Sequence, residues 1–192
     1  MKSKKNGLII CHVILMGLMC VLSLVSALII FSGKNPEGYE VFTEAQKNAS
    51  YVIGAGHLAN MFALICGMIY MLKGGGKAVA KLYKAFLLLV TVGLVLRLAG
   101  KLIHPGFDVS AGLMIGSILM LLILTFVKDL GKIKTGCVFH ILFILDLAWV
   151  ILMFDSREAL SSIASGLTRL ILDSTIGLAI YAKYRDKAAR GK

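Results

Sequence analysis

Residues 167–178 read Leu-Thr-Arg-Leu-Ile-Leu-Asp-Ser-Thr-Ile-Gly-Leu and place two charges inside the last long apolar segment of the chain. Arg169 and Asp173 are four residues apart, so they share one face of a helix, and Ser165 extends this face toward one end. Hydrocarbon solvates neither a guanidinium nor a carboxylate. We therefore expect this face to point toward other helices or water.

The composition is typical of a membrane protein. Hydrophobic residues make up 58% of the 192 residues and charged residues only 16%, whereas soluble domains have about 45–50% apolar and about 25% charged residues. The net charge of +11 raises the question of nucleic acid. The basic residues lie in short connections between apolar segments, however, so we expect the lipid bilayer as a partner and no nucleic acid.

Six apolar segments are long enough to cross about 30 Å of hydrocarbon as helices. The first is much longer than the apolar core of a signal peptide, which usually has about 7–15 residues. The sequence therefore predicts an all-α protein with a single domain over residues 1–192. The six transmembrane helices are expected at about 7–31, 51–72, 85–103, 109–127, 137–154 and 160–181.

Lysine and arginine are distributed unevenly among the connections. Both ends of the chain and the connections 73–84 and 128–136 are rich in them, whereas 32–50 and 155–159 contain only Lys34, Lys47 and Arg157. Cytoplasmic connections carry the excess of Lys and Arg. We therefore predict a multi-pass protein of the cell membrane with cytoplasmic N and C termini.

Two patterns of small residues predict close helix packing, because small side chains let neighbouring backbones approach. In 109–127 the pattern is Gly112-x-x-x-Gly116. In 51–72 a small residue recurs at every fourth position: Ala55, Ala59, Ala63 and Gly67.

Polar residues of four segments fall at similar depth. A rise of about 1.5 Å per residue places most of them roughly 9–19 Å below the outer face. Among these residues the basic side chains exceed the carboxylates by one charge, so an anionic or zwitterionic ligand would complete the balance. The candidate ligand-binding residues are His57, Asn60, Arg97, Lys101, Asp146, Arg169 and Asp173.

The same charges also allow a purely structural interpretation. Arg169 and Asp173 would pair within one helix, Asp146 would pair with Arg97, and Lys101 would reach the headgroups. The protein would then be a membrane scaffold or interaction protein without a ligand.

The histidines allow a third interpretation. His12 and His140 are expected near the cytoplasmic face, and His57 and His104 near the outer face. Such pairs are axial haem ligands, and the helix number with one pair in each leaflet resembles cytochromes of the b561 type. Here the pairs would join the first helix with the fifth and the second with the third, unlike that family. A haem electron carrier is thus an alternative function; otherwise we expect no cofactor.

Enzyme motifs such as Gly-x-Ser-x-Gly and His-Glu-x-x-His are absent, so we do not expect an enzyme. We also expect neither a disulfide nor a metal site, since the cysteines lie within or at the edge of apolar segments: Cys11, Cys20, Cys66 and Cys137.

In its size, six helices and cytoplasmic termini the whole chain resembles the substrate-binding subunits of energy-coupling-factor vitamin transporters. Those subunits usually carry Ala-x-x-x-Ala on the first helix for docking a partner, where this chain has Ser23-x-x-x-Ala27. The resemblance implies recognition or transport of a small polar solute, with other membrane subunits as partners.

Overall fold

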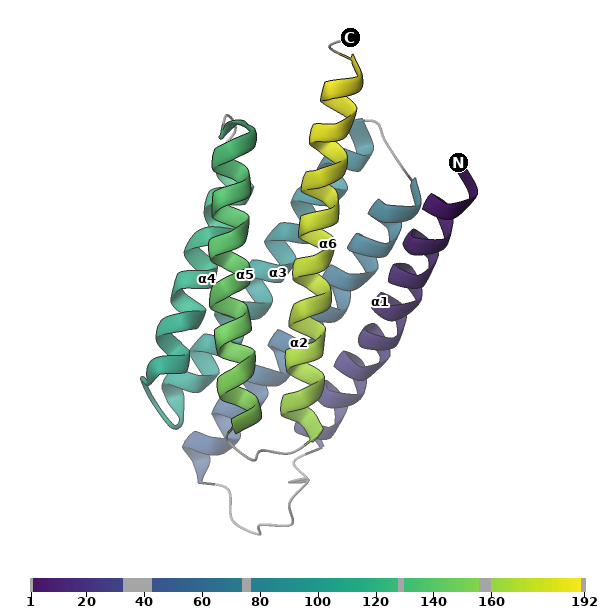
Figure 1. Ribbon diagram of the computed structural model, residues 1–192. Helices are drawn as coiled ribbons and strands as arrows, with labels where there is room; N and C mark the ends of the chain where they lie inside the picture. The colour runs from purple at the N-terminus through teal and green to yellow at the C-terminus, as the bar shows by residue number, and fades with distance from the viewer. Residues whose placement is uncertain (1, 33–42, 74–76, 128–129, 156–159, 191–192) are drawn as a thin grey trace.

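The computed structural model describes residues 2–32, 43–73, 77–127, 130–155 and 160–190, and the regular secondary structure in these ranges is helical (Figure 1). The predicted all-α class is therefore confirmed, and each predicted segment corresponds to one helix. The helices are α1 (Lys2–Phe31), α2 (Glu44–Lys73), α3 (Lys77–Ile103), α4 (Val109–Phe126), α5 (Gly131–Asp155) and α6 (Leu160–Arg190).

The helices form a bundle in which each one packs against its neighbours in sequence. The most extensive contact joins α2 and α3, and α6 completes the ring by packing on both α5 and α1. The N and C termini lie at the same end of the bundle, together with the first turns of α3 and α5 (Figure 1). This end is the one that the sequence marks as rich in lysine and arginine.

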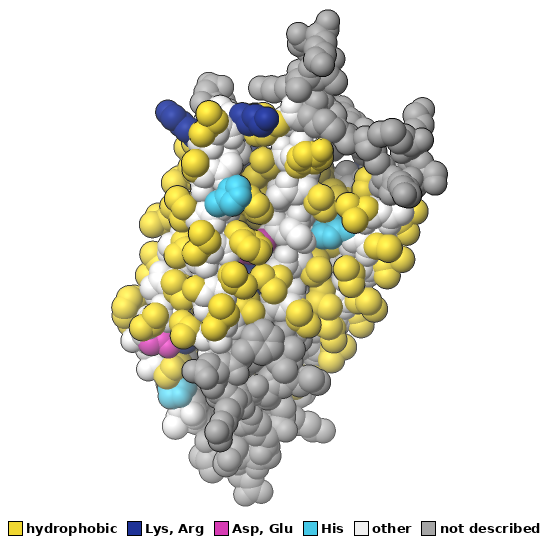
Figure 2. All heavy atoms as spheres, in the orientation of Figure 1, with side chains coloured by type: hydrophobic (Ala, Val, Ile, Leu, Met, Phe, Trp, Pro, Cys, Tyr) yellow, Lys and Arg dark blue, Asp and Glu magenta, His cyan; other side chains and the backbone are white. Residues whose placement is uncertain are grey.

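Five helices, α1 to α5, are long and apolar enough to cross a membrane. Large apolar side chains point outward from them; Leu8, Val21 and Leu28 of α1 are 65%, 60% and 59% exposed. Figure 2 shows such side chains over the middle of one face, with Lys and Arg at one end. An apolar surface of this extent is stable in lipid and not in water, which indicates a multi-pass membrane protein. The sixth span, α6, stays a prediction.

Several helices begin earlier than predicted, because apolar residues mark only the part of a helix that lies in hydrocarbon. For α2, Thr43 and Gln46 supply the missing signal. The Gln46 amide donates to Thr43 Oγ1 at 3.3 Å, and the Thr43 amide donates to Gln46 Oε1 at 2.8 Å. This reciprocal capping box satisfies two amides that have no partner within the helix, so the helix starts at Glu44.

Glycines bring α2 and α3 into backbone contact. A Cβ on Gly56 would lie 2.9 Å from the carbonyl oxygen of Gly93 and 2.7 Å from Cγ of Arg97. A Cβ on Gly93 would in turn overlap the side-chain amide of Asn60. These two glycines therefore bring Arg97 and Asn60 close to the opposite helix.

The predicted patterns of small residues have different outcomes. On α2, Ala59 and Ala63 are 8% and 0% exposed, as their pattern predicts. On α4, Gly116 touches Leu145, but a Cβ on Gly112 would meet nothing within 4 Å. The expectation that Gly112 packs closely is therefore wrong, because its position on α4 faces open space.

Gly56→Ala is expected to lower the free energy of unfolding by about 1–3 kcal/mol, because the added methyl group has no room beside the Gly93 carbonyl. Gly112→Ala is the matched control on another helix. It should be neutral or stabilising by up to about 1 kcal/mol, since alanine favours a helix more than glycine does. Thermal melting of the detergent-solubilised protein measures both. Equal melting temperatures for the two variants would contradict the close approach of α2 and α3.

Candidate functional site

An ion pair between α5 and α6 lies in the interior of the bundle. Arg169 donates from Nε to Asp146 Oδ2 at 2.7 Å, and its Nη2 lies 2.5 Å from the same oxygen. From α4, Ser117 donates its hydroxyl to Asp146 Oδ1 at 2.6 Å. Both charged side chains are 3% exposed. Asp146 thus has donors for both oxygens from two different helices.

Asp173 lies one turn from Arg169 on α6, and its surroundings differ from those of Asp146. Its carboxylate is fully buried, and Oδ1 is 3.7 Å from Arg169 Nε. Within the described residues neither oxygen of Asp173 accepts a hydrogen bond. Burial of a charge without hydrogen bonds is costly, and the nearby Asp146 carboxylate repels a second negative charge. A charged Asp173 would therefore need a further donor.

Arg97 of α3 is the second buried guanidinium. It is 8% exposed, and its Cζ lies 4.8 Å from the centre of the Trp149 ring. It is close enough to Arg169 and Asp146 to interact with both charges. The ion pairs among the described residues do not include Arg97. Among the described residues, the direct contact of the Arg97 guanidinium is with the indole of Trp149, an interaction worth up to about 2 kcal/mol.

Two further predicted residues come from α2, and both face α3. His57 is 5% exposed and interacts electrostatically with Arg97. Asn60 is also 5% exposed and contacts α3 at Gly93. The structure therefore places both residues beside Arg97. We define the polar cluster as His57, Asn60, Arg97, Ser117, Asp146, Trp149, Arg169 and Asp173.

Lys101, the remaining predicted ligand residue, lies outside this cluster. It pairs with Asp108 at 2.9 Å at the turn between α3 and α4, and Asp108 also caps α4 by accepting from the Ala111 amide. The charge of Lys101 is thus balanced at the end of the bundle. Without Lys101 the site contains two arginines and two aspartates, so the excess of one positive charge that the sequence predicts for it is not present there.

The pKa of Asp108 is shifted at this turn. Desolvation raises the pKa of Asp108, but hydrogen bonds from Lys101 and the Ala111 amide lower it by more. The net pKa therefore lies below the ordinary value. A carboxyl group whose pKa is lowered in the folded protein stabilises the fold at pH values above its ordinary pKa. That contribution is lost as the pH falls through the lowered pKa.

Three of the four histidines have partners of their own. His12 on α1 hydrogen-bonds through Nε2 to Thr175 on α6 at 2.8 Å. His104 lies 3.3 Å from the Gln46 amide nitrogen, and Nδ1 of His140 lies 2.6 Å from the carbonyl oxygen of Gly136 in its own helix. Haem ligation by the four histidines stays a prediction, which the presence or absence of a Soret band in the purified protein would test.

Sequence position predicts the depth of the charges but misses two of their contacts. Ser117 is a small polar residue in a helix without charges, and only its bond to Asp146 distinguishes it. Trp149 follows Asp146 by three residues, so both lie on one face of α5. That spacing is a signal that the sequence contains, and it links the indole to the charged cluster.

Within the described residues the polar cluster thus combines the close ion pair of Arg169 with Asp146, a cation outside the ion pairs (Arg97) and a carboxylate whose ion pair with Arg169 is longer, at 3.7 Å (Asp173). Helices α2 to α6 contribute these residues. Comparison with protein-family models, with curated proteins and with solved structures finds no match for this chain.

Proposed function

We propose that the protein recognises or transports a small polar solute with an anionic group, and preferably also a cationic group, at the polar cluster. The observation that supports this most is the pair of incompletely partnered charges, Arg97 and Asp173. Arg97 makes no ion pair within the described residues, and the oxygens of Asp173 accept no hydrogen bond there. A zwitterion would complement both.

The chemistry of each group suits one end of such a solute. A guanidinium binds a carboxylate or phosphate through two parallel hydrogen bonds, and the Trp149 ring holds Arg97 from one side. An ammonium group would donate to the oxygens of Asp173. The pair of Arg169 with Asp146 carries no net charge, so it would serve as the fixed frame between the two ends.

A polar face on α6 leads from the cluster toward the start of that helix. Ser165 is 5% exposed and lies one turn before Arg169 on the same side of α6, whereas Thr168 is 3% exposed and donates to Met19 Sδ of α1 at 3.8 Å. The hydroxyl group of Ser165 would provide a hydrogen bond to a solute or to water that enters from this end.

We also infer that α6 is the sixth span and that this entrance faces the outside of the cell membrane. Since α6 packs on both α5 and α1, a bundle that crosses the bilayer carries it across. Both termini lie at one end (Figure 1). The lysine-rich connections belong to this end, and the positive-inside rule assigns it to the cytoplasm.

Cysteines introduced at the two ends of the bundle test this orientation. In a background without the four native cysteines, Lys47→Cys and Phe107→Cys should react with a membrane-impermeant maleimide in intact cells. Ile133→Cys should react only after permeabilisation. All three positions have exposed side chains. Reaction of Ile133→Cys in intact cells would contradict cytoplasmic termini.

Thermal melting with a panel of small solutes tests the proposed function. The panel pairs each zwitterion with its anionic analogue, such as glycine with acetate and β-alanine with propionate, and adds phosphate. A ligand that binds only the folded protein stabilises it by about 2.7 kcal/mol at 100 times its Kd. At least one solute should therefore raise the melting temperature of the parent in a concentration-dependent manner.

Two variants of α3 show whether such a shift arises at the polar cluster. Arg97→Met should abolish it, whereas Lys101→Met, which removes a cation from the same helix outside the cluster, should retain it. If no solute shifts the parent, or if both variants retain the shift, the proposed site is wrong. The protein would then be better described as a scaffold without a ligand.

A further inference from the structure

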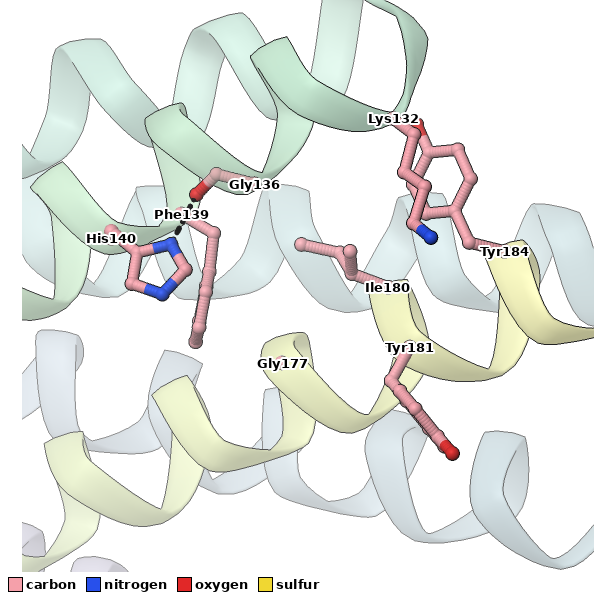
Figure 3. A pocket seen from close by; sticks show the side chains of 8 residues that line it. All are labelled: Lys132, Gly136, Phe139, His140, Gly177, Ile180, Tyr181 and Tyr184. Carbon is pink, nitrogen blue, oxygen red and sulfur yellow. Dashed lines mark hydrogen bonds between the residues drawn. The ribbon is translucent and has the colours of Figure 1, made fainter.

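A second site lies between α5 and α6, at the end of the bundle that holds both termini. It is an open pocket of about 410 Å³ (Figure 3). None of its lining residues belongs to the polar cluster. The lining includes Lys132, Gly136, Phe139, His140, Gly177 and Tyr184.

Two glycines give the pocket its shape. A Cβ on Gly136 of α5 would meet nothing within 4 Å, so this residue leaves space that a larger side chain would occupy. Across the pocket, a Cβ on Gly177 of α6 would lie 2.8 Å from Cζ of Phe139. The ring of Phe139 therefore packs against bare backbone of α6, and the hollow beside it has an apolar wall suited to a hydrocarbon chain.

The end of the pocket that lies nearest the first turn of α5 is polar and basic. Tyr184 of α6 donates its hydroxyl to the carbonyl oxygen of Gly131 at 2.9 Å, which ties α6 to the first turn of α5. Lys132 follows in the same turn, is exposed, and lies beside Tyr184 in Figure 3. Among the described residues that line the pocket, none is acidic. The pocket thus joins an apolar wall to a cation at the end of a spanning helix.

We propose that this pocket binds one anionic phospholipid, with the phosphate at Lys132 and part of an acyl chain along Gly136 and Phe139. A membrane lipid is the occupant whose apolar and anionic parts match this arrangement, because Lys132 stands at the start of the apolar span of α5, Gly131–Leu152. Basic pockets between helices at this membrane face select anionic headgroups. The proposal depends on membrane insertion and not on the solute site.

Native mass spectrometry of the detergent-purified protein tests the lipid site, with phosphatidylglycerol and phosphatidylcholine of identical acyl chains added separately. The parent should bind phosphatidylglycerol more tightly. Lys132→Gln should reduce that preference about fivefold, the contribution of one lysine near an anionic surface. Lys134→Gln, an exposed lysine of the same helix that does not line the pocket, should leave it unchanged.

A second variant tests the acyl-chain part of the pocket. Gly136→Leu places a bulky side chain in the hollow, at a position where an added Cβ meets nothing within 4 Å, and should abolish binding of both lipids. Gly112→Leu, at an equally open position on α4, should not. Equal binding of the two lipids by the parent, or equal losses in Lys132→Gln and Lys134→Gln, would overturn the proposal. Inorganic phosphate that displaces phosphatidylglycerol at equimolar concentration would also overturn it, since the site would then recognise a free anion.

Discussion

Asp146→Asn is expected to lower the free energy of unfolding by about 3–5 kcal/mol, the usual cost of removing one member of a buried ion pair. The carboxylate accepts from Arg169 at 2.7 Å and from Ser117 at 2.6 Å. An amide of the same shape would leave the buried Arg169 guanidinium with only the more distant Asp173 carboxylate, 3.7 Å away, as counter-charge. Reversible unfolding in mixed micelles, or the shift in melting temperature, measures the loss.

Asp173→Asn is the matched control, because it removes the same charge from a carboxylate with equal burial but without donors. Its expected cost is much smaller than that of Asp146→Asn, since the oxygens of Asp173 accept no hydrogen bond within the described residues. Replacing both Asp146 and Arg169 should recover much of the loss. Equal losses in the free energy of unfolding for the two asparagine variants would show that the donors to Asp146 do not stabilise the fold.

Arg97→Met is expected to leave the ligand-free protein at least as stable as the parent while it abolishes solute binding. The change gives up a cation–π contact worth up to about 2 kcal/mol. It also removes the cost of burying a charge without a carboxylate partner, which amounts to several kcal/mol per ion. A net gain of about 1 kcal/mol or more is therefore expected, and methionine retains much of the stem that packs against Gly56.

The melting temperature of Arg97→Met without ligand separates a functional residue from a structural one. A residue that is kept for binding typically costs stability when no ligand is present. A fall as large as that for Asp146→Asn would mean that Arg97 holds the bundle together. The indole contact would then be its main role.

The helices could be predicted from the sequence because the bilayer imposes one strong constraint, a long apolar run for each span. Their true starts depend on other contacts. Thr43 and Gln46 begin α2 by hydrogen bonds to each other's amides, and this capping box lies outside the apolar run. In α6 the charges of Arg169 and Asp173 interrupt the apolar segment, yet the helix continues through both residues.

The pairing of Arg169 with Asp173 one turn apart could also be predicted, but the close partner of Asp146 could not. Position along a helix gives depth, whereas partner choice depends on how each helix is rotated and which helix stands beside it. Asp146 therefore pairs with Arg169 of the neighbouring α6 rather than with Arg97. Lys101 pairs with Asp108 at the turn between α3 and α4, because its long flexible side chain reaches this exposed carboxylate.

The most direct test of the account is the affinity of the parent and of Asp173→Asn for a zwitterion and for its analogue without the ammonium group, measured by isothermal titration calorimetry. The account predicts that the parent prefers the zwitterion about tenfold or more, since a buried charge-assisted hydrogen bond contributes about 1.5–3 kcal/mol. Asp173→Asn should bind both compounds with the weaker affinity. A preference that persists unchanged in Asp173→Asn, or the absence of binding by either compound to the parent, would contradict it.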